Sequence, residues 1–382
     1  MNITFFGTYD TSNTPRVQAL IDGLKAHDHQ VTECNAPLKV NTASRVAIMK
    51  QPWRLPLLGG HILRCWVRLI AKSRHLPQTD LVVVGHLGQF DIQLAHLLFR
   101  KKPIALDFMI SGTETAEDRG ALHQPVQGGA KGGLKVKILG WLDEAALKKS
   151  TIIIVDTEEH RQDLPNHHRS KGVVVNVGAP PSWFEAGEAE AKRKVTKPIT
   201  VAFFGNYIPL QGAPIIAEAT RYMKAPVTIT MVGPHGQDFA KAQAAAQPAT
   251  GPATIKWVDH WVPIDELPTL MAQHDVCLGV FGTSPKAAKV VPNKVYQCAA
   301  AGGAIVTSDT PSQRRVFGPS AIYTPPGDAH ALAGALDKLA NDPKEVQRLR
   351  AAAFSLAKRS FRPEQIILPF LKKLEEQSLL TN

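Results

Sequence analysis

Short runs of apolar residues recur along the whole chain, and segments with the periodicity of amphipathic helices lie between them. The runs do not alternate with polar residues, which is typical of strands buried on both faces of a parallel sheet. The expected strands are Ile3–Phe6, Leu81–Val84, Ile104–Leu106, Ile152–Val155, Val173–Asn176, Thr200–Phe204, Val227–Val232, Val276–Val280 and Ala304–Thr307. The expected helices include Arg16–His27, Asp91–Phe99, Leu134–Lys148 and Lys294–Ala301. This order predicts doubly wound α/β domains.

A weak internal repeat divides the chain into two halves. Phe5-Phe6-Gly7-Thr8-Tyr9 returns as Phe203-Phe204-Gly205-Asn206-Tyr207, each time after an apolar run and before a loop and a helix. A chain of 382 residues is also long enough for two domains of about 150–200 residues. We therefore expect domains at residues 1–180 and 198–360, joined through the polar stretch Ala179–Lys197. Residues 361–382 are expected to form a C-terminal helix that packs back on the first domain.

Ligands of open parallel sheets bind outside the carboxyl ends of the strands. Gly7 and Gly205 follow the first strand of each half, so we expect them on opposite walls of a cleft, an arrangement that suits an enzyme joining two substrates. The chain has no GxGxxG after its first strand, no GxxxxGK[ST] and no GxSxG. These absences disfavour a dinucleotide oxidoreductase, a P-loop enzyme and a hydrolase with a nucleophile elbow.

Cysteine and histidine spacing gives no indication of a metal or of disulfides. The four cysteines, Cys34, Cys65, Cys277 and Cys298, are far apart and contain no CxxC pair, so we expect buried thiols in a reducing compartment. His167 and His168 lie in a polar loop and are interpreted as solvated surface. From this spacing we expect no metal site, and no cofactor is expected. The N-terminal residues lack the features of a secretory signal, so we also expect a cytoplasmic protein that starts at or near Met1.

The formal net charge of +11 is unevenly distributed. No acidic residue lies between Cys34 and Asp80, a stretch that holds Lys39, Arg45, Lys50, Arg54, Arg64, Arg68, Lys72 and Arg74. Such a basic field attracts nucleic acid, anionic lipid or phosphorylated substrates. No motif of a nucleic-acid module is present, so nucleic acid is not an expected partner. Within the stretch, residues 53–72 combine apolar and basic positions at helical spacing, which fits either a helix at a membrane interface or a core helix with a basic outer face.

The segment Lys289–Asp309 is the strongest candidate for chemistry. It contains a loop with Pro292, a helix of small residues, two glycines and a buried strand. Proline suits the first turn of a helix, and the free amides of that turn, with Lys289 and Lys294, can hold a diphosphate. The alternative is a helix that packs closely on a sheet and needs alanine and glycine only for room.

This segment resembles the donor-binding motif of retaining GT-B glycosyltransferases of family 4, Pro-x-Lys-x-x-Glu-x-x-Ala-x-Gly-x-Pro-Val-Val. The matching positions are Pro292, Lys294, Ala300, Gly302 and Ile305-Val306. The loop from Phe204-Gly205 to Pro209 and Gly212 is similar to the Gly-x-x-x-x-x-Lys-Gly loop of that family, and Asp275–Phe281 to its strand before the donor loop. Phe6–Asp10 with Arg16, and Gly85–Asp91, look like a bacterial subgroup. The resemblance implies the GT-B fold, in which two Rossmann-like domains face each other across a cleft.

Two departures from the family pattern concern the donor. The family often carries a Glu-x7-Glu pair for the sugar and the ribose, and the matching positions here are Lys289 and Gln297. The basic residue of the Lys-Gly loop is Gln211. The stereochemical outcome and the donor sugar are therefore left open. The residues expected to bind the nucleotide-sugar are Gly7, Arg16, Gly205, Asn206, Lys289, Asn293, Lys294 and Gln297.

The acceptor side offers three candidates for contacts with a sugar or for a general base. His86 follows an apolar strand, Asp107 ends one, and Asp118 lies in the polar loop after it. Each of them also fits a structural role in capping, packing or loop solvation. Lys289 joins these catalytic candidates because the departing diphosphate must be stabilised electrostatically.

The expected function is that of a hexosyltransferase-like enzyme. The resemblance implies a UDP- or GDP-type donor, a retaining, metal-independent reaction and a hydroxyl acceptor on a cell-surface glycan, a lipid-linked saccharide or a related molecule. A peripheral position on the inner face of the cytoplasmic membrane is the corresponding location. A non-catalytic sugar-nucleotide-binding subunit and a GT-B-fold sugar-nucleotide epimerase are the alternatives.

Overall fold

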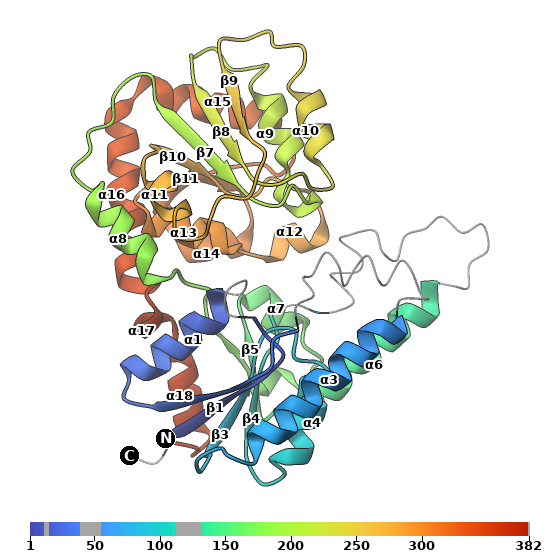
Figure 1. The fold of residues 1–382 in the computed structure, drawn as a ribbon. Coiled ribbons are helices and arrows are strands. Elements are labelled where there is room, and N and C mark those ends of the chain that lie inside the picture. The colour runs from blue at the N-terminus through green and yellow to red at the C-terminus, as the bar shows by residue number, and fades with distance from the viewer. Residues whose placement is uncertain (11–14, 39–54, 110, 112–131, 381–382) are drawn as a thin grey trace. The chain divides into compact units, whose positions relative to one another are not determined.

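The computed structural model describes residues 1–10, 15–38, 55–109, 111 and 132–380 (Figure 1). It divides the chain into two compact units. Unit 1 holds Met1–Asn176 together with Pro363–Asn382, and unit 2 holds Val177–Arg362. Each unit contains one six-stranded sheet whose paired strands are all parallel. The predicted doubly wound α/β architecture is therefore confirmed.

The sheet of unit 1 has the strand order β2-β1-β3-β4-β5-β6. Its strands are β1 (Asn2–Gly7), β2 (Gln30–Asn35), β3 (Leu81–Val84), β4 (Ile104–Asp107), β5 (Ile152–Val155) and β6 (Gly172–Val174). The α-helices of this unit are α1 (Pro15–Ala26), α3 (Leu55–Ser73), α4 (Asp91–Leu98), α6 (Gly132–Lys149), α7 (Glu158–Asp163), α17 (Pro363–Ile366) and α18 (Leu368–Glu376). The register places Ile3 of β1 opposite Val31 of β2 and Leu81 of β3.

The sheet of unit 2 has the order β12-β11-β10-β7-β8-β9. Its strands are β7 (Thr200–Phe204), β8 (Thr228–Val232), β9 (Thr254–Val258), β10 (Val276–Leu278), β11 (Ala304–Ser308) and β12 (Ala321–Thr324). The α-helices are α8 (Pro181–Ala189), α9 (Ala213–Ala219), α10 (Phe239–Ala245), α11 (Leu267–Ala272), α12 (Pro285–Lys289), α13 (Asn293–Ala300), α14 (Pro311–Phe317), α15 (Ala329–Asn341) and α16 (Pro343–Ser360).

Both faces of the unit 1 sheet are covered, which explains its apolar strands. Phe5 of β1 and Val83 of β3 face a core that also contains residues of α1, α17 and α18. Their neighbours Phe6 and Val84 face a second core, built with residues of α3 and α4. Successive side chains of a strand point to opposite faces, so most positions of these strands are apolar, and the buried Thr4 of β1 has a hydrogen-bond partner in Thr79 at 2.8 Å.

The sequence reasoning missed the strands β2, β9 and β12. Each of them lies at the edge of its sheet. An edge strand keeps part of its surface in water, and β2, for example, buries only Cys34 fully. Polar residues are therefore tolerated in β2 and β9, and no apolar run marks these two strands. The third strand, β12, is a short apolar segment that the prediction overlooked.

The C-terminal residues return to the first unit. Ile366, Ile367 and Phe370 are buried in the same core as β1 and α1. The backbone approaches α1 so closely that a β-carbon at Gly23 would lie 2.4 Å from the Pro363 carbonyl oxygen. The polar stretch where we expected the domain boundary, Ala179–Lys197, carries α8 and lies in unit 2.

Candidate functional site

The loops after β7 and β10 are tied together at the carboxyl edge of the unit 2 sheet. A β-carbon at Gly205 would lie 2.1 Å from Oε1 of Gln211, so any other residue would require the Gln211 side chain to move. The Phe281 amide donates to the Gln211 carbonyl at 3.1 Å and fixes the loop from the other side. Gln211 itself is buried, and its Oε1 accepts no hydrogen bond from the residues that the structure describes. Asn206, next to Gly205, is exposed.

Lys294 is the most unusual residue of this edge. Its side chain leaves the first turn of α13 and is buried, with 4% of the residue exposed. The Nζ atom lies 3.8 Å from the centre of the Phe203 ring. Within the described part of the chain this Nζ has no hydrogen-bond partner. Burial lowers the pKa of Lys294 from its ordinary 10.5 to about 7.

A buried ammonium group without a counter-charge is costly, and buried charges in proteins are normally paired. The contact with the Phe203 ring compensates for only part of this cost, because a cation–π contact contributes about 0.5–2 kcal/mol. The arrangement around Lys294 is therefore complementary to an anion.

The first turn of α13 provides further groups that can bind an anion. The helix follows Pro292, whose side chain cannot cap it, so the free backbone amides of the first turn remain uncapped by a side chain. The positive end of the helix dipole adds to their effect. Asn293 opens the helix and is half-buried, and Gln297, 6% exposed, lies three residues after Lys294 on the same face. The half-buried Lys289 ends the preceding helix α12.

In unit 1, the carboxylate of Asp91 fixes the loop after β1. Gly7 ends β1, and the amide and hydroxyl of Thr8 donate to Oδ2 of Asp91 at 2.7 and 2.8 Å. The indole of Trp66 donates to Oδ1 of Asp91 at 3.1 Å. Asp91 therefore connects the β1 loop with α3 and α4, and Gly7 lies where the first strand meets this network.

Arg16 and Asp107 form a buried ion pair. Nε of Arg16 lies 2.8 Å from Oδ1 of Asp107, and its Nη1 donates to the Val175 carbonyl at 2.9 Å. The two residues are 1% and 2% exposed. Burial raises the pKa of Asp107, and the charge and hydrogen bond of Arg16 act against this increase. In this arrangement both side chains hold the unit together and neither reaches its surface.

Of the two remaining acceptor-side candidates, His86 and Asp118, the structure describes only His86. His86 is half-buried and follows β3 by two residues. The preceding Gly85 packs against Tyr9, since a β-carbon there would lie 2.6 Å from the tyrosine ring. His86 therefore lies near the β1 loop. Asp118 lies outside the described residues.

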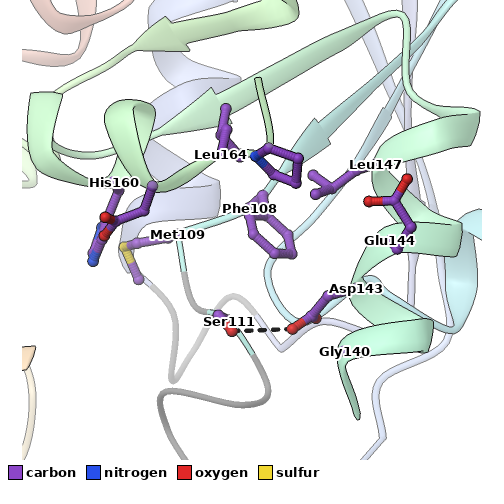
Figure 2. Close-up of a pocket in the computed structure, with 11 residues that line it drawn as sticks. Phe108, Met109, Ser111, Gly140, Asp143, Glu144, Leu147, His160 and Leu164 are labelled. Carbon is purple, nitrogen blue, oxygen red and sulfur yellow. Dashed lines mark hydrogen bonds between the residues drawn. The ribbon is translucent and has the colours of Figure 1, made fainter. Parts of the chain in front are cut away.

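A cavity of about 180 Å³ opens in unit 1 beside the ends of β4 and β5 (Figure 2). Phe108, Leu147 and Leu164 form its apolar part, and Oγ of Ser111 donates to Asp143 at 3.0 Å. His160 on α7 also lines it, with Nδ1 2.5 Å from Oδ1 of the buried Asp156. The sequence reasoning missed this cavity, although two acidic residues within a basic helix were a usable signal.

The interpretation of the adjacent histidines as solvated surface is wrong for His168. The His168 side chain is only 5% exposed, whereas the His167 side chain is 65% exposed. Both histidines hydrogen-bond through Nε2 to Oε1 of Glu144, at 3.1 Å from His167 and 3.0 Å from His168. Partial burial acts to raise the pKa of Glu144, but the hydrogen bonds from the two histidines outweigh it and lower the pKa. The turn before His168, whose amide donates to the Pro165 carbonyl, folds the polar loop back onto α6.

Residues 220–372 match a family described as glycosyl transferase-like. Over the whole chain, the structure is similar to sucrose-phosphate synthase from Thermosynechococcus elongatus, with a TM-score of 0.68 at 12% identity and 99% of each chain covered. It is also similar to Anabaena HepE in complex with UDP-glucose, with a TM-score of 0.62 at 16% identity and 100% of each chain covered. The chain therefore has the GT-B fold.

A third similar structure is the UDP-forming α,α-trehalose-phosphate synthase from Burkholderia vietnamiensis, with a TM-score of 0.63 at 14% identity, covering 100% of this chain and 99% of that one. At the level of sequence, no curated protein matches the chain. None of the helices in the described ranges is both long and apolar enough to cross a membrane.

In this GT-B protein, the predicted donor residues fall into two groups. Six of them belong to unit 2, namely Gly205, Asn206, Lys289, Asn293, Lys294 and Gln297. Nζ of Lys294 contacts the ring of Phe203 beside the β7 loop. Gly7 and Arg16 belong to unit 1. The sequence analysis did not predict the contact between Lys294 and the Phe203 ring. The repeated Phe-Phe-Gly sequence could have indicated that an aromatic ring lies beside the β7 loop.

Proposed function

We propose that the chain transfers a sugar from a UDP- or GDP-type nucleotide-sugar to a hydroxyl acceptor. The buried Nζ of Lys294, which lacks an anionic partner within the described structure, carries this proposal. A nucleoside diphosphate supplies two phosphate groups at the end of a helix, where amides and a lysine can bind them. The names of similar structures, which include complexes with UDP and UDP-glucose, support a uridine nucleotide.

In this mechanism unit 2 stabilises the leaving group. As the glycosidic bond to the phosphate breaks, negative charge grows on the diphosphate, and Lys294, Lys289 and the α13 amides interact with it more strongly. Asn293, Asn206 and Gly205 border the same edge and position the donor, and Gln297 takes the ribose. The family resemblance favours retention without a metal ion, with the donor phosphate taking the proton of the acceptor hydroxyl.

The cavity of unit 1 is the proposed acceptor pocket. Its apolar residues suit the flat face of a sugar ring, and its carboxylates can accept hydrogen bonds from hydroxyl groups. His160, whose Nδ1 is oriented by Asp156, is the described residue best placed to handle a proton there. His86 and Asp118 stay predictions for acceptor contacts.

A donor panel tests this proposal. UDP or GDP at about 100 times its dissociation constant should stabilise the protein by roughly 2.7 kcal/mol. Turnover is followed as nucleotide release and as labelled product with a cell-envelope extract. If no nucleoside diphosphate binds at millimolar concentration, the donor site has been misassigned.

Binding without turnover would instead favour a non-catalytic sugar-nucleotide-binding subunit. The presence of Lys289 and Gln297 at positions where the family often has carboxylates is the observation that favours this alternative. Interconversion of nucleotide-sugars without an acceptor would identify an epimerase.

We further propose that α3 attaches the protein to the cytoplasmic face of an anionic membrane, where lipid-linked or cell-surface acceptors are assembled. Cys65 and Leu69 of this helix are buried, whereas Leu63 and Val67 are 62% and 59% exposed. The exposed Arg64 and Arg68 adjoin these apolar residues, a combination typical of helices that lie in a membrane surface.

Vesicle binding tests the α3 surface. Arg64→Glu with Arg68→Glu should reduce binding to anionic vesicles, and the binding of the unmodified protein should weaken with salt. Lys224→Glu with Lys344→Glu, two exposed residues of unit 2, is a control with the same change in charge. Equal loss of binding in both double variants would show that net charge and not α3 is responsible.

A further inference from the structure

Glu144, His167 and His168 bring three metal-ligating side chains together outside the donor site. One ligand atom from each of them lies within 4.8 Å of the other two. We propose that these three residues, the Glu144 cluster, bind a divalent transition-metal ion of the zinc type. The proposal does not depend on the proposed transferase function, although Glu144 also lines the cavity that we propose as the acceptor pocket.

The distances within the Glu144 cluster are close to those around a zinc ion. Zinc binds histidine nitrogen and carboxylate oxygen at about 2.0–2.2 Å, which places tetrahedral ligands about 3.4 Å apart. Here Nε2 of His167 and Nε2 of His168 lie 3.1 and 3.0 Å from the same oxygen of Glu144. An ion can take the place of the protons in these two hydrogen bonds if each imidazole keeps its proton on Nδ1, or releases one to solvent when doubly protonated, and if the side chains separate by a few tenths of an ångström.

The protein holds two of the three ligands in place before an ion binds. The His168 side chain is 5% exposed, and its backbone amide is fixed by the Pro165 carbonyl. Glu144 projects from α6, a helix of 18 residues. The His167 side chain is 65% exposed and that of Glu144 43%, so an ion can enter from solvent and keep a water molecule as a further ligand.

The ligand set favours zinc over magnesium or calcium. Two imidazoles and one carboxylate suit zinc and similar transition ions, whereas magnesium and calcium prefer oxygen ligands throughout. The charge of Lys171 acts on Glu144 and opposes a cation at this position. With three protein ligands and this repulsion, we expect micromolar affinity, weaker than that of a structural zinc site.

The sequence gives no sign of this site because its ligands have no regular spacing. The side chains of two adjacent residues in a regular helix point in different directions and cannot bind the same ion. Glu144 also precedes His167 by 23 residues. Only the turn at 165–168 brings both rings to one side, with their centroids 4.1 Å apart.

The experiment uses the full chain without a histidine tag. Zinc titration by calorimetry gives the affinity, and cobalt substitution gives a visible spectrum that reports the ligand type. His167→Ala should weaken zinc binding by at least about 100-fold, since loss even of an outer-shell partner costs about 10–100-fold. Glu144→Gln, which keeps the shape of the side chain, should also weaken it.

His235→Ala is the matched control. His235 is an exposed histidine beside a single carboxylate, with Nε2 3.3 Å from Asp259, and it has the same residue type and a similar exposure as His167. Its variant should bind zinc like the unmodified protein. The proposal is overturned if the unmodified protein binds no zinc at micromolar concentration, or if His167→Ala and His235→Ala bind equally. Thiolate bands in the cobalt spectrum would also overturn it, because they would place the ion at the buried cysteines.

Discussion

The sequence Phe-Phe-Gly-x-Tyr occurs at the end of β1 in unit 1 and of β7 in unit 2. The two units nevertheless differ in how a buried cation is compensated. In unit 1, Arg16 of α1 lies 2.8 Å from the buried carboxylate of Asp107. In unit 2, Lys294 of α13 contacts the ring of Phe203, and its Nζ has no hydrogen-bond partner within the described structure. The first cation is neutralised by the protein, whereas the second is not.

This difference supports our proposal that Lys294 binds an anionic ligand, whereas Arg16 already has a counter-charge within the protein. The two charges of this ion pair compensate each other without substrate, although Nη2 of Arg16 and Oδ2 of Asp107 have no hydrogen-bond partner within the described structure. Removing one partner leaves an unpaired charge inside the protein. A buried lysine without a carboxylate is destabilising in the free protein and is compensated when an anion binds. Replacing each cation by an apolar residue should therefore change stability in opposite directions.

The largest effect is expected for Arg16→Met. Asp107 would remain buried without its counter-charge, at a cost of about 3–5 kcal/mol. Hydrogen exchange of peptides from β1 and β4 measures the effect within unit 1, which is preferable to a single transition for a two-unit chain. The double variant Arg16→Met with Asp107→Leu should recover most of the loss. A single variant as stable as the unmodified protein would show that the pair contributes nothing.

Lys294→Met should show the reverse pattern. Its stability without ligand should be equal or higher, because the variant no longer buries an unpaired charge. The affinity for UDP should fall by about 1.5–3 kcal/mol, the usual contribution of a hydrogen bond to a charged group. Lys224→Met, at an exposed lysine of the same unit, is the control in calorimetry. Unchanged UDP affinity would remove Lys294 from the donor site.

Gln297→Ala tests the ribose contact one turn further along α13. Loss of a buried hydrogen-bond partner should weaken donor binding by about 1–3 kcal/mol. Gln297→Glu should preserve substantial function, since a carboxylate accepts the same hydrogen bonds. Donor affinity and turnover are compared for both variants, with circular dichroism to detect misfolding. An alanine variant with normal affinity and rate would mean that Gln297 only packs.

The smallest effect concerns pH. The pKa of Lys294 in the folded protein, about 7, lies below its ordinary value of 10.5, so between these values the unfolded chain binds more protons. Stability without ligand should therefore rise with pH from about 7, by less than about 1.4 kcal/mol per pH unit, and UDP affinity should fall. The quantity to measure is the difference between the unmodified protein and Lys294→Met, because buried thiols such as Cys34, with a raised pKa, titrate in the opposite sense. Identical pH profiles would contradict the assignment.

The sequence predicted the central strands well because burial on both faces leaves a continuous apolar run, as in β3 and β5. Edge strands such as β9, with one exposed face, carry no such mark. The proposed donor segment could be identified from the sequence because its residues are contiguous. The pairing of Arg16 with Asp107 joins positions 91 residues apart, and no local pattern records such a contact.

The return of the chain to unit 1 also has a consequence for synthesis. All of unit 2 lies between Asn176 and Pro363, so the ribosome completes it before unit 1 has its last helices. Until α17 and α18 emerge, the apolar face of β1 and α1 that covers Phe370 and Ile367 stays open. Transiently exposed apolar surface of this kind promotes aggregation during synthesis. The final residues thus determine when the first strand of the protein becomes part of a finished core.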